Sequence, residues 1–330
     1  MSGRNYTEGK SPEELIGHIG FGEPVVVDNQ KQKRVLITGA GSYIGDSFSS
    51  YSTKNYPLLS ISTIDMLDGS WKREDFSSYD IVYHVAGIAH ADVGNVPEET
   101  KEKYYKVNTD LAVEVARKCK EEGVKEFIFM SSMIVYGDSA PYGKTKIVDE
   151  HTIPHPANFY GDSKLQADVA VRDLADGIFK VMVLRPPMIY GKGSKGNYPT
   201  LAKLAKKLPI FPNVNNERSM LYINNLCEFL CQIMFVEFRI PSVVLIPQNA
   251  EWTTTSEMVK EIGEVSGKKV RVVGILNPVV WLSSKMPGKI GRLVNKAFGN
   301  SCYAHSVSLY DGINYQKVNL KESIRRTEGE

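Results

Sequence analysis

A tyrosine and a lysine stand four residues apart in the segment Tyr160-Gly-Asp-Ser-Lys164. On a helix this spacing places both side chains on one face. A nearby ammonium group favours the phenolate form and lowers the pKa of the phenol, which would make Tyr160 a general acid/base for a substrate hydroxyl. Two hydroxyl residues, Ser131 and Ser132, come earlier in the chain, and either could bond the same substrate oxygen. Because such a tyrosine–lysine spacing is also common in surface pairs, its meaning depends on the motifs around it.

A glycine-rich turn, Thr38-Gly-Ala-Gly-Ser-Tyr-Ile-Gly45, follows a short apolar segment and opens a helical one. Gly39 permits a tight turn, Gly41 lets the backbone approach a pyrophosphate, and Gly45 allows the helix to pack closely on a sheet. The free N–H groups at the start of the helix would then face the negative charge. We therefore predict a dinucleotide site whose turn comprises Gly39, Gly41, Ser42, Tyr43, Ile44 and Gly45.

An acidic residue, Asp65, lies twenty positions after Gly45, at the end of the next apolar segment. A carboxylate there can bond the ribose hydroxyls of the adenosine and would repel a 2′-phosphate, so NAD is the predicted cofactor in preference to NADP. Asp68 is an alternative for this role, and the neighbouring cations Lys72 and Arg73 oppose the preference for NAD. A solvated turn residue is the other interpretation of Asp65.

The elements that position these residues alternate between strands and helices. Short apolar segments rich in Val and Ile predict strands over residues 34–38, 59–65, 80–86, 127–130 and 180–184. Apolar residues at helical spacing predict helices over 100–122 and 159–174. This alternation predicts an α/β fold, a Rossmann-type doubly wound parallel sheet with a smaller C-terminal substrate lobe. We expect a polar N-terminal lead (1–33), an NAD-binding domain (34–185) and a mostly substrate-binding lobe (186–330) from which some segments return to the sheet.

Composition narrows the class of protein. The chain of 330 residues is 42% hydrophobic and has a formal charge of +2, which argues against a dedicated nucleic-acid-binding protein. Four cysteines follow neither a disulfide pattern nor a zinc pattern, so we expect reduced core residues and no metal, although Cys227 and Cys231 lie one helical turn apart. Neither a signal peptide nor an apolar run of membrane-spanning length is visible, and a cytoplasmic protein is expected.

Further motifs follow one another in a recognisable order. Besides the glycine turn and the Tyr160–Lys164 pair, they are His84-Val-Ala-Gly87, Asn108, Ser131-Ser132-Met-Ile-Val-Tyr136-Gly137 and Arg185-Pro-Pro-Met-Ile-Tyr-Gly191. Together they resemble the extended short-chain dehydrogenases/reductases, specifically the NAD-dependent nucleotide-sugar epimerase/dehydratase group and its UDP-glucose 4-epimerase-like subgroup. The resemblance covers roughly residues 34–230.

This resemblance assigns roles to individual residues. It implies that Ser132, Tyr160 and Lys164 form the catalytic trio, with Ser132 and Tyr160 also contacting a UDP-sugar substrate. It implies that Asn108 supports the backbone of the site and that Ala86, Gly87, Asn108, Tyr160 and Lys164 join the glycine turn and Asp65 around the cofactor. Arg218 matches the family's arginine on the nucleotide diphosphate, and Asn197 lies in a segment similar to the substrate-binding one.

The chain departs from the family pattern in three places. Ser42 replaces the usual middle glycine of the cofactor turn, which is expected to loosen or re-aim the pyrophosphate contact. The stretch before His84 is short, so one strand or helix of the sheet is expected to be trimmed. Met133 and Ile134 stand where sugar 4,6-dehydratases carry an Asp-Glu pair, which argues against a dehydratase.

Once dehydratases are set aside, the enzymes of this group that remain act on a single carbon that carries a hydroxyl. We favour a UDP-hexose or UDP-N-acetylhexosamine 4-epimerase with a transient 4-keto intermediate over an NAD(P)H-dependent 4-keto-sugar reductase of surface polysaccharide synthesis. A non-catalytic dinucleotide-binding protein is a third hypothesis, opposed by the intact trio. Dimers are common in the family, so a homodimer is one expectation. His90 is a further residue that could face the substrate, with a plain loop histidine as the alternative.

Residues 275–298 mix apolar and basic side chains. The apolar residues Val279, Val280, Leu282, Ile290, Leu293 and Val294 are interleaved with Trp281, Lys285, Lys289, Arg292 and Lys296, and Pro287-Gly288 divides the run in two. A basic amphipathic helix pair can rest on anionic lipid with tryptophan at the interface. Because two short helices bury little area and the cations are few, we expect instead that the apolar face packs on the second lobe and that membrane association is not stable.

Overall fold

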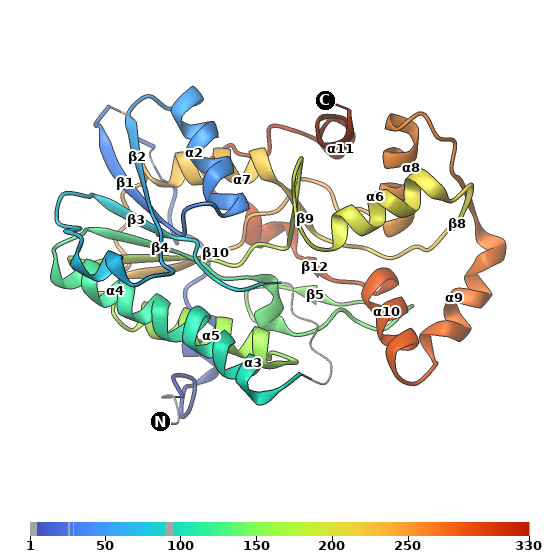
Figure 1. Ribbon diagram of the computed structural model, residues 1–330, viewed down its shortest axis with the longest axis horizontal. Helices are drawn as coiled ribbons and strands as arrows, with labels where there is room; N and C mark the ends of the chain where they lie inside the picture. Colours follow the sequence, from blue (N-terminus) through green and yellow to red (C-terminus); the bar gives the residue numbers. More distant parts are fainter. Residues whose placement is uncertain (1–4, 26, 29, 90–95, 330) are drawn as a thin grey trace.

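Six parallel strands form the central sheet of the computed structural model, which describes residues 5–25, 27–28, 30–89 and 96–329 (Figure 1). The order across the sheet is β10-β6-β4-β3-β1-β2. The strands are β1 (Lys33–Thr38), β2 (Leu59–Ile64), β3 (Ile81–His84), β4 (Glu126–Met130), β6 (Lys180–Leu184) and β10 (Ser242–Leu245). Each of the five predicted strands is present within two residues at either end. The predicted α/β fold class is confirmed.

Helices cover both faces of this sheet, which explains why its inner strands are mostly apolar. Figure 1 shows α2 (Tyr43–Asn55) and α7 (Ile223–Ile233) on one face. It shows α3 (Glu98–Tyr104), α4 (Leu111–Glu121) and α5 (Phe159–Arg172) on the other. Inner strand residues such as Val35, Ile81 and Phe127 have no exposed surface. All four cysteines are free and buried, so the prediction that they are apolar core residues is confirmed.

The predicted helix over 100–122 is one continuous helical run of three parts. They are α3 (Glu98–Tyr104), a π-helical segment η2 (Tyr105–Asp110) and α4 (Leu111–Glu121). The extra residue in a π-helical turn changes the direction of the side chains, and such turns are frequent at functional sites. Here the turn contains Asn108, whose side chain is buried.

The connection from β2 to β3 is short. Between these strands the only helical element is the 3-10 turn η1 (Ser70–Arg73), and β2 is the edge strand of the sheet. The prediction that one element is trimmed before His84 is confirmed. The chain passes from β1 to β2 on one side and returns to β3 on the other, so the strand order reverses at the carboxyl end of β1, the place where open α/β sheets bind ligands.

The second lobe is built from short elements beside the carboxyl edge of the sheet. Two-stranded pairs join β7 to β9, β8 to β11 and β5 to β12. The elements are η3 (Met133–Tyr136), β5 (Ile147–Val148), β7 (Met188–Tyr190), α6 (Asn197–Lys207), β8 (Ile210–Pro212), β9 (Met220–Tyr222), α8 (Thr255–Val265), β11 (Arg271–Val273), η4 (Gly274–Leu276), α9 (Asn277–Ser284), α10 (Lys289–Phe298), β12 (Cys302–Tyr303), η5 (His305–Ser308) and α11 (Leu320–Glu328).

The N-terminal segment packs on the sheet domain. Ser11 and Glu14 form a capping box at α1 (Pro12–Ile16), and Ile19 makes a parallel bridge with Val244 of β10. Phe21, a little further on, is buried in the larger hydrophobic core. These contacts tie the segment before β1 to the far edge of the sheet.

The predicted packing of residues 275–298 is wrong. Val279, Leu282, Ile290 and Leu293 are exposed by half or more of their surface, and of the predicted apolar set only Val280 is buried. The reason is that α9 and α10 contact the second lobe through other residues: polar groups, described below, and Phe298, whose ring lies 5.7 Å from that of Phe211. Within the described part of the chain, no helix is both long and apolar enough to cross a membrane.

Candidate active site

The glycine turn between β1 and α2 has the backbone that its sequence predicts. Gly39 and Gly41 have φ values of 110° and 75°, which only glycine adopts without strain. A Cβ atom on Gly39 would lie 2.9 Å from the backbone nitrogen of Ala86, so a side chain there would push β1 and β3 apart. Ser42 is the N-cap of α2, and its hydroxyl accepts a hydrogen bond from the Gly45 N–H at 3.2 Å. The serine therefore orders the start of the helix.

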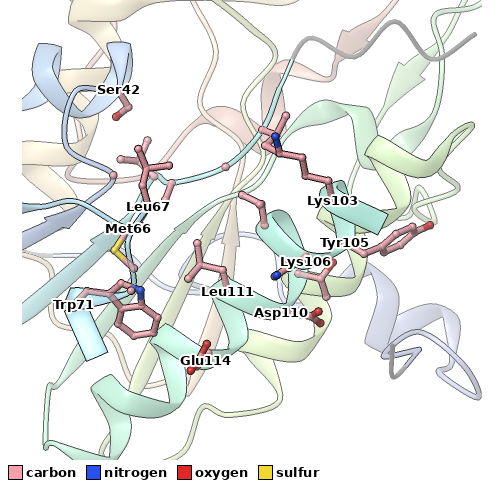
Figure 2. Close-up of a pocket in the computed structure, with 18 of the residues that line it drawn as sticks. Ser42, Met66, Leu67, Trp71, Lys103, Tyr105, Lys106, Asp110, Leu111 and Glu114 are labelled. Carbon is pink, nitrogen blue, oxygen red and sulfur yellow. The ribbon is translucent and has the colours of Figure 1, made fainter. Parts of the chain in front are cut away.

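A cavity of about 1680 Å³ lies in front of this turn, at the carboxyl edge of β1, β2 and β3. Figure 2 shows its wall, with Ser42 on one side and Lys106, Asp110 and Glu114 of the helical run on another. The wall also includes residues that follow the strands, namely Gly39, Ala40, Gly41, Asp65, Met66, Leu67, Val85, Ala86, Gly87 and Ile88. The volume exceeds that of drug-sized ligand sites and is ample for a dinucleotide.

Asp65 lies directly after β2, where it lines the cavity with an exposed carboxylate. Its Oδ1 accepts a hydrogen bond from the Leu67 N–H at 2.8 Å, which orients the group. Asp68 accepts from the Ser70 N–H and is not part of the cavity wall. Of the two cations that could attract a 2′-phosphate, Lys72 lines the cavity and Arg73 does not, and Lys72 forms an ion pair with Glu114.

Asn108 fixes the segment after β3 to α5. Its side chain is buried, and Oδ1 accepts from the Ile88 N–H at 2.8 Å while Nδ2 donates to the Ile88 carbonyl at 3.1 Å. The same Nδ2 donates to Ser163 Oγ at 3.1 Å. Three bonds from one amide thus set the distance between the wall of the cavity and the helix that carries Tyr160 and Lys164.

Tyr160 and Ser132 lie together, since their side chains share a hydrogen bond. Ser132 is the N-cap of η3 after β4, and Tyr160 lies in the first turn of α5 with its ring against Tyr104 (centroids 5.7 Å apart). Burial raises the pKa of Tyr160 to about 12, and the hydrogen bond with Ser132 opposes this rise. The phenol therefore holds its proton at neutral pH in this structure.

Lys164 lies one helical turn after Tyr160 and is buried. Its ammonium donates to the Met130 carbonyl at 3.0 Å, and a Cβ on Gly87 would lie 3.0 Å from Nζ. Burial lowers its pKa to about 8. The prediction that Lys164 lowers the pKa of Tyr160 is wrong here, because the ammonium is directed at the end of β4 and at Gly87 and the burial of the phenol outweighs its influence.

The two predicted residues of the second lobe lie apart from the cavity wall. Asn197 is exposed at the first position of α6. Arg218 is partly buried, and its guanidinium donates to the carbonyls of Lys296 (2.8 Å) and Gly299 (3.4 Å) at the carboxyl end of α10. Burial lowers the pKa of this group. His90 lies outside the described residues.

Sequence reasoning missed a buried charge cluster behind the site. Arg185 donates to both carboxylate oxygens of Asp168 at 2.8 Å, to Tyr136 Oη at 2.8 Å and to the Ile16 carbonyl at 2.9 Å, and Arg172 donates to Asp168 at 3.0 Å. The cluster joins α5, η3 and the last carbonyls of α1. The Arg185-Pro-Pro motif was visible in the sequence, but its partners are far away in the chain, so spacing gave no indication of the cluster.

The sequence of this chain is similar to those of known proteins. The model of the NAD dependent epimerase/dehydratase family matches residues 35–239. A UDP-glucose 4-epimerase of Vibrio cholerae is 29% identical over 255 residues, which is 71% of this chain and 76% of that protein. An N-acetyl-alpha-D-glucosaminyl-diphospho-ditrans,octacis-undecaprenol 4-epimerase of Escherichia coli O157:H7 is 30% identical over 215 residues, or 59% of this chain and 61% of that protein.

The fold has close counterparts among solved structures. A Thermus thermophilus UDP-glucose 4-epimerase, solved as a complex with NAD, superposes with a TM-score of 0.65 over 89% of this chain and 97% of that one, at 20% identity. At this identity the likeness establishes the fold alone.

Proposed function

Because the chain belongs to the NAD-dependent epimerase/dehydratase family, we propose that it is a 4-epimerase of a nucleotide-linked sugar, a UDP-hexose or a UDP-N-acetylhexosamine. The observation that carries the proposal is the hydrogen-bonded pair of Tyr160 and Ser132, with Lys164 one turn further along the helix. Lys164 Nζ lies 3.0 Å from where a Cβ on Gly87 would stand, and Gly87 lines the large cavity, so this helix face borders the cavity. The names of the Vibrio and Escherichia relatives, both 4-epimerases, support this choice.

The cavity fits a dinucleotide. The glycine turn lets the backbone approach a diphosphate, and the Asp65 carboxylate is suited to ribose hydroxyls. Gly39, Gly41, Ser42, Tyr43, Ile44, Gly45, Asp65, Ala86, Gly87, Asn108, Tyr160 and Lys164 are the residues that would hold NAD. When bound there, NAD supplies reversible hydride transfer at the C4 carbon of the sugar.

The chain's own residues then handle the proton. Tyr160 Oη takes the proton of the C4 hydroxyl and later returns it to the C4 oxygen, with Ser132 as its hydrogen-bond partner. The raised pKa of Tyr160 suits the return step, in which the phenol donates. Formation of the phenolate needs positive charge nearby. Lys164 lies on the same helix face and would supply that charge once its ammonium turns from the Met130 carbonyl towards Tyr160.

Dehydration is not the proposed reaction. Met133 and Ile134 occupy the first turn of η3, directly after Ser132, where a dehydratase would need carboxylates. The Met133 N–H donates to the Pro186 carbonyl, and its sulfur accepts from Ser301 Oγ at 3.5 Å. Neither side chain can transfer a proton, so removal of water across C5–C6 has no general acid or base at this position.

The substrate is proposed to reach from this pair into the second lobe. Arg218 would bind the diphosphate, since its planar guanidinium suits phosphate oxygens, and Asn197 would contact the sugar nucleotide. The guanidinium already bonds two carbonyls at the end of α10, which holds it in place but also occupies some of its donors.

A direct assay tests the proposal. Incubation of the purified protein with UDP-glucose or UDP-N-acetylglucosamine should give the 4-epimer, detected by NMR, without net consumption of added NAD(P)H. Tyr160→Phe should slow this conversion by at least ~10²-fold, since only the proton-transferring oxygen is removed. Tyr104→Phe is the matched control, because it keeps the ring that packs on Tyr160.

Two outcomes would contradict the assignment. If Tyr160→Phe retains more than about a third of the activity, Tyr160 does not carry the acid/base step. If the wild type instead consumes NAD(P)H in proportion to an added UDP-4-keto sugar and epimerises nothing, it is a 4-keto-sugar reductase.

A further inference from the structure

Exposed apolar side chains gather on the helical hairpin formed by α9 and α10, residues 275–298. Seven of the fifteen large apolar side chains found exposed in the described part of the chain lie here: Ile275, Val279, Trp281, Leu282, Met286, Ile290 and Leu293. Scattered exposed apolar residues are normal on a protein surface, but a cluster of this kind marks an interaction site. Figure 1 shows α9 at the end of the molecule farthest from the six-stranded sheet, and the hairpin therefore faces outward.

The same hairpin carries charge of one sign only. No Asp or Glu occurs between Glu264 and Asp311, whereas this stretch has seven Lys and Arg residues. On α10, Lys289, Arg292 and Lys296 recur at helical spacing beside the apolar stripe of Ile290 and Leu293. The cations are exposed, and none of the ion pairs found among the described residues includes them. An apolar stripe flanked by cations is the composition of a helix that lies on an anionic bilayer.

The hairpin is attached to the second lobe by polar contacts and by Phe298, which packs on Phe211, and not by the exposed apolar residues. Asn295 Oδ1 accepts from the Tyr142 N–H at 2.9 Å, and its Nδ2 donates to the Ser284 carbonyl at 3.0 Å. Thr255 Oγ1 donates to the Ala297 carbonyl at 2.6 Å. With the bonds from Arg218, these contacts hold the polar side and the carboxyl end of α10. Because these contacts hold the opposite side of the hairpin, its exposed apolar side chains face the solvent.

We propose that the α9–α10 hairpin docks the protein on the surface of a bilayer that contains anionic lipid. The two helices have eight and ten residues, too short to span a bilayer but sufficient to lie in its interface. Trp281 and Leu282 enter the boundary between headgroups and acyl chains, and the cations contact lipid phosphates. This inference does not depend on the proposed reaction.

A second copy of the chain is a poorer occupant of this surface. In a symmetric dimer the same patch faces itself, so the stretch with seven cations and no carboxylate would meet an identical stretch. Like charges across such an interface oppose association. An anionic surface has the complementary charge, and we therefore assign the hairpin to lipid.

The test is cosedimentation of the full-length protein with vesicles at physiological salt. We expect most of the wild type to pellet with vesicles of phosphatidylcholine and phosphatidylglycerol and little with phosphatidylcholine alone. Lys285→Gln/Lys289→Gln/Arg292→Gln should lower the partition coefficient by about 10²-fold, roughly fivefold per cation. Trp281→Ser/Leu282→Ser should also abolish pelleting, because it removes the apolar contact. Exposed lysines elsewhere give the matched control, Lys31→Gln/Lys54→Gln/Lys125→Gln, which should pellet like the wild type.

Three results would overturn the proposal. The wild type could remain in the supernatant with anionic vesicles, or the control variant could lose binding as fully as the hairpin variants. The third result would come from sedimentation velocity without lipid. If the wild type is a dimer and the hairpin substitutions dissociate it, the surface binds a second copy of the chain. Circular dichroism of every variant confirms that lost binding does not come from unfolding.

Discussion

The two ends of the candidate site are held by different kinds of contact. At the cofactor end, Asn108 and Lys164 are buried, and each bonds the backbone of another element, so the cavity wall is rigid. At the substrate end, Asn197 is exposed. Arg218 bonds the carboxyl end of α10, a helix whose outer face is exposed to solvent. This difference suggests that a fixed scaffold holds the common dinucleotide, whereas the region that selects the substrate is free to vary.

The largest effect is expected from a substitution in the buried charge cluster of Asp168, Arg172 and Arg185, which lies behind the cofactor end of the site. Asp168→Asn removes the charge that two buried arginines share, and breaking a buried pair in this way costs about 3–5 kcal/mol of unfolding free energy. Urea unfolding at pH 7, followed by circular dichroism, measures the loss. Burial raises the pKa of Asp168, but Arg185 and Arg172 outweigh it and hold the pKa below its usual range. The stabilisation is therefore present above the ordinary aspartate pKa and is lost as the pH falls below it.

Asp173→Asn is the control for this experiment. Its carboxylate is about half exposed and pairs with Lys10 at 3.0 Å, so its removal should cost less than about 1 kcal/mol. If both variants lose equally little, the cluster does not stabilise the fold and the rigid end needs another explanation.

Lys164→Met separates function from stability at the cofactor end. We expect epimerisation to fall by at least ~10²-fold, because the variant lacks the ammonium that would favour the phenolate during proton transfer. The stability difference should depend on pH. A buried lysine with a pKa of about 8, against 10.5 when unperturbed, destabilises the fold fully below pH 8. As the pH rises from 8 to 10.5 this penalty disappears, so the wild type gains about 3 kcal/mol relative to the variant.

Chemical denaturation across that pH range measures the effect. Lys203→Met, an exposed position on α6, provides the control and should show a difference that is independent of pH. A flat difference for Lys164→Met would mean that Lys164 titrates normally and that the rigid end does not hold it away from water.

At the substrate end the expected effect is smaller. Arg218→Ala should weaken binding of UDP by about 1–3 kcal/mol, the range for losing a charge-assisted hydrogen bond. Calorimetry with UDP measures this change, and NAD affinity should be unaffected. Arg271→Ala, which removes an exposed arginine of β11 in the same lobe, should leave UDP affinity unchanged. Unaltered UDP affinity in Arg218→Ala would remove this residue from the proposed site and leave it as an anchor of α10.

The same contrast explains what could be predicted from the sequence. The glycine turn, Asp65 and the segment from Tyr160 to Lys164 lie in local patterns, since each belongs to one strand–turn–helix unit or one helix turn. The direction of the Lys164 ammonium could not be predicted, because it depends on the Met130 carbonyl of β4. Arg185 and Asp168 likewise meet only in the folded chain. The packing of the α9–α10 hairpin was predicted wrongly, because an amphipathic pattern shows that a helix has an apolar face but does not show what covers that face.

The smallest expected effect concerns the preference for NAD. Asp65 lines the cavity, whereas Asp68 does not, and Lys72 is paired with Glu114, so the Asp65 carboxylate should repel a 2′-phosphate. We expect NADH to bind about tenfold more tightly than NADPH, roughly 1.4 kcal/mol, and Asp65→Ser to remove most of this preference. Trp71, which is buried in the cavity wall, makes intrinsic fluorescence a suitable signal for both titrations. Asp68→Ser is the matched control and should keep the preference. Tighter binding of NADPH to the wild type would show that Lys72 leaves Glu114 to meet the phosphate, and the cofactor end would then be less rigid than its contacts indicate.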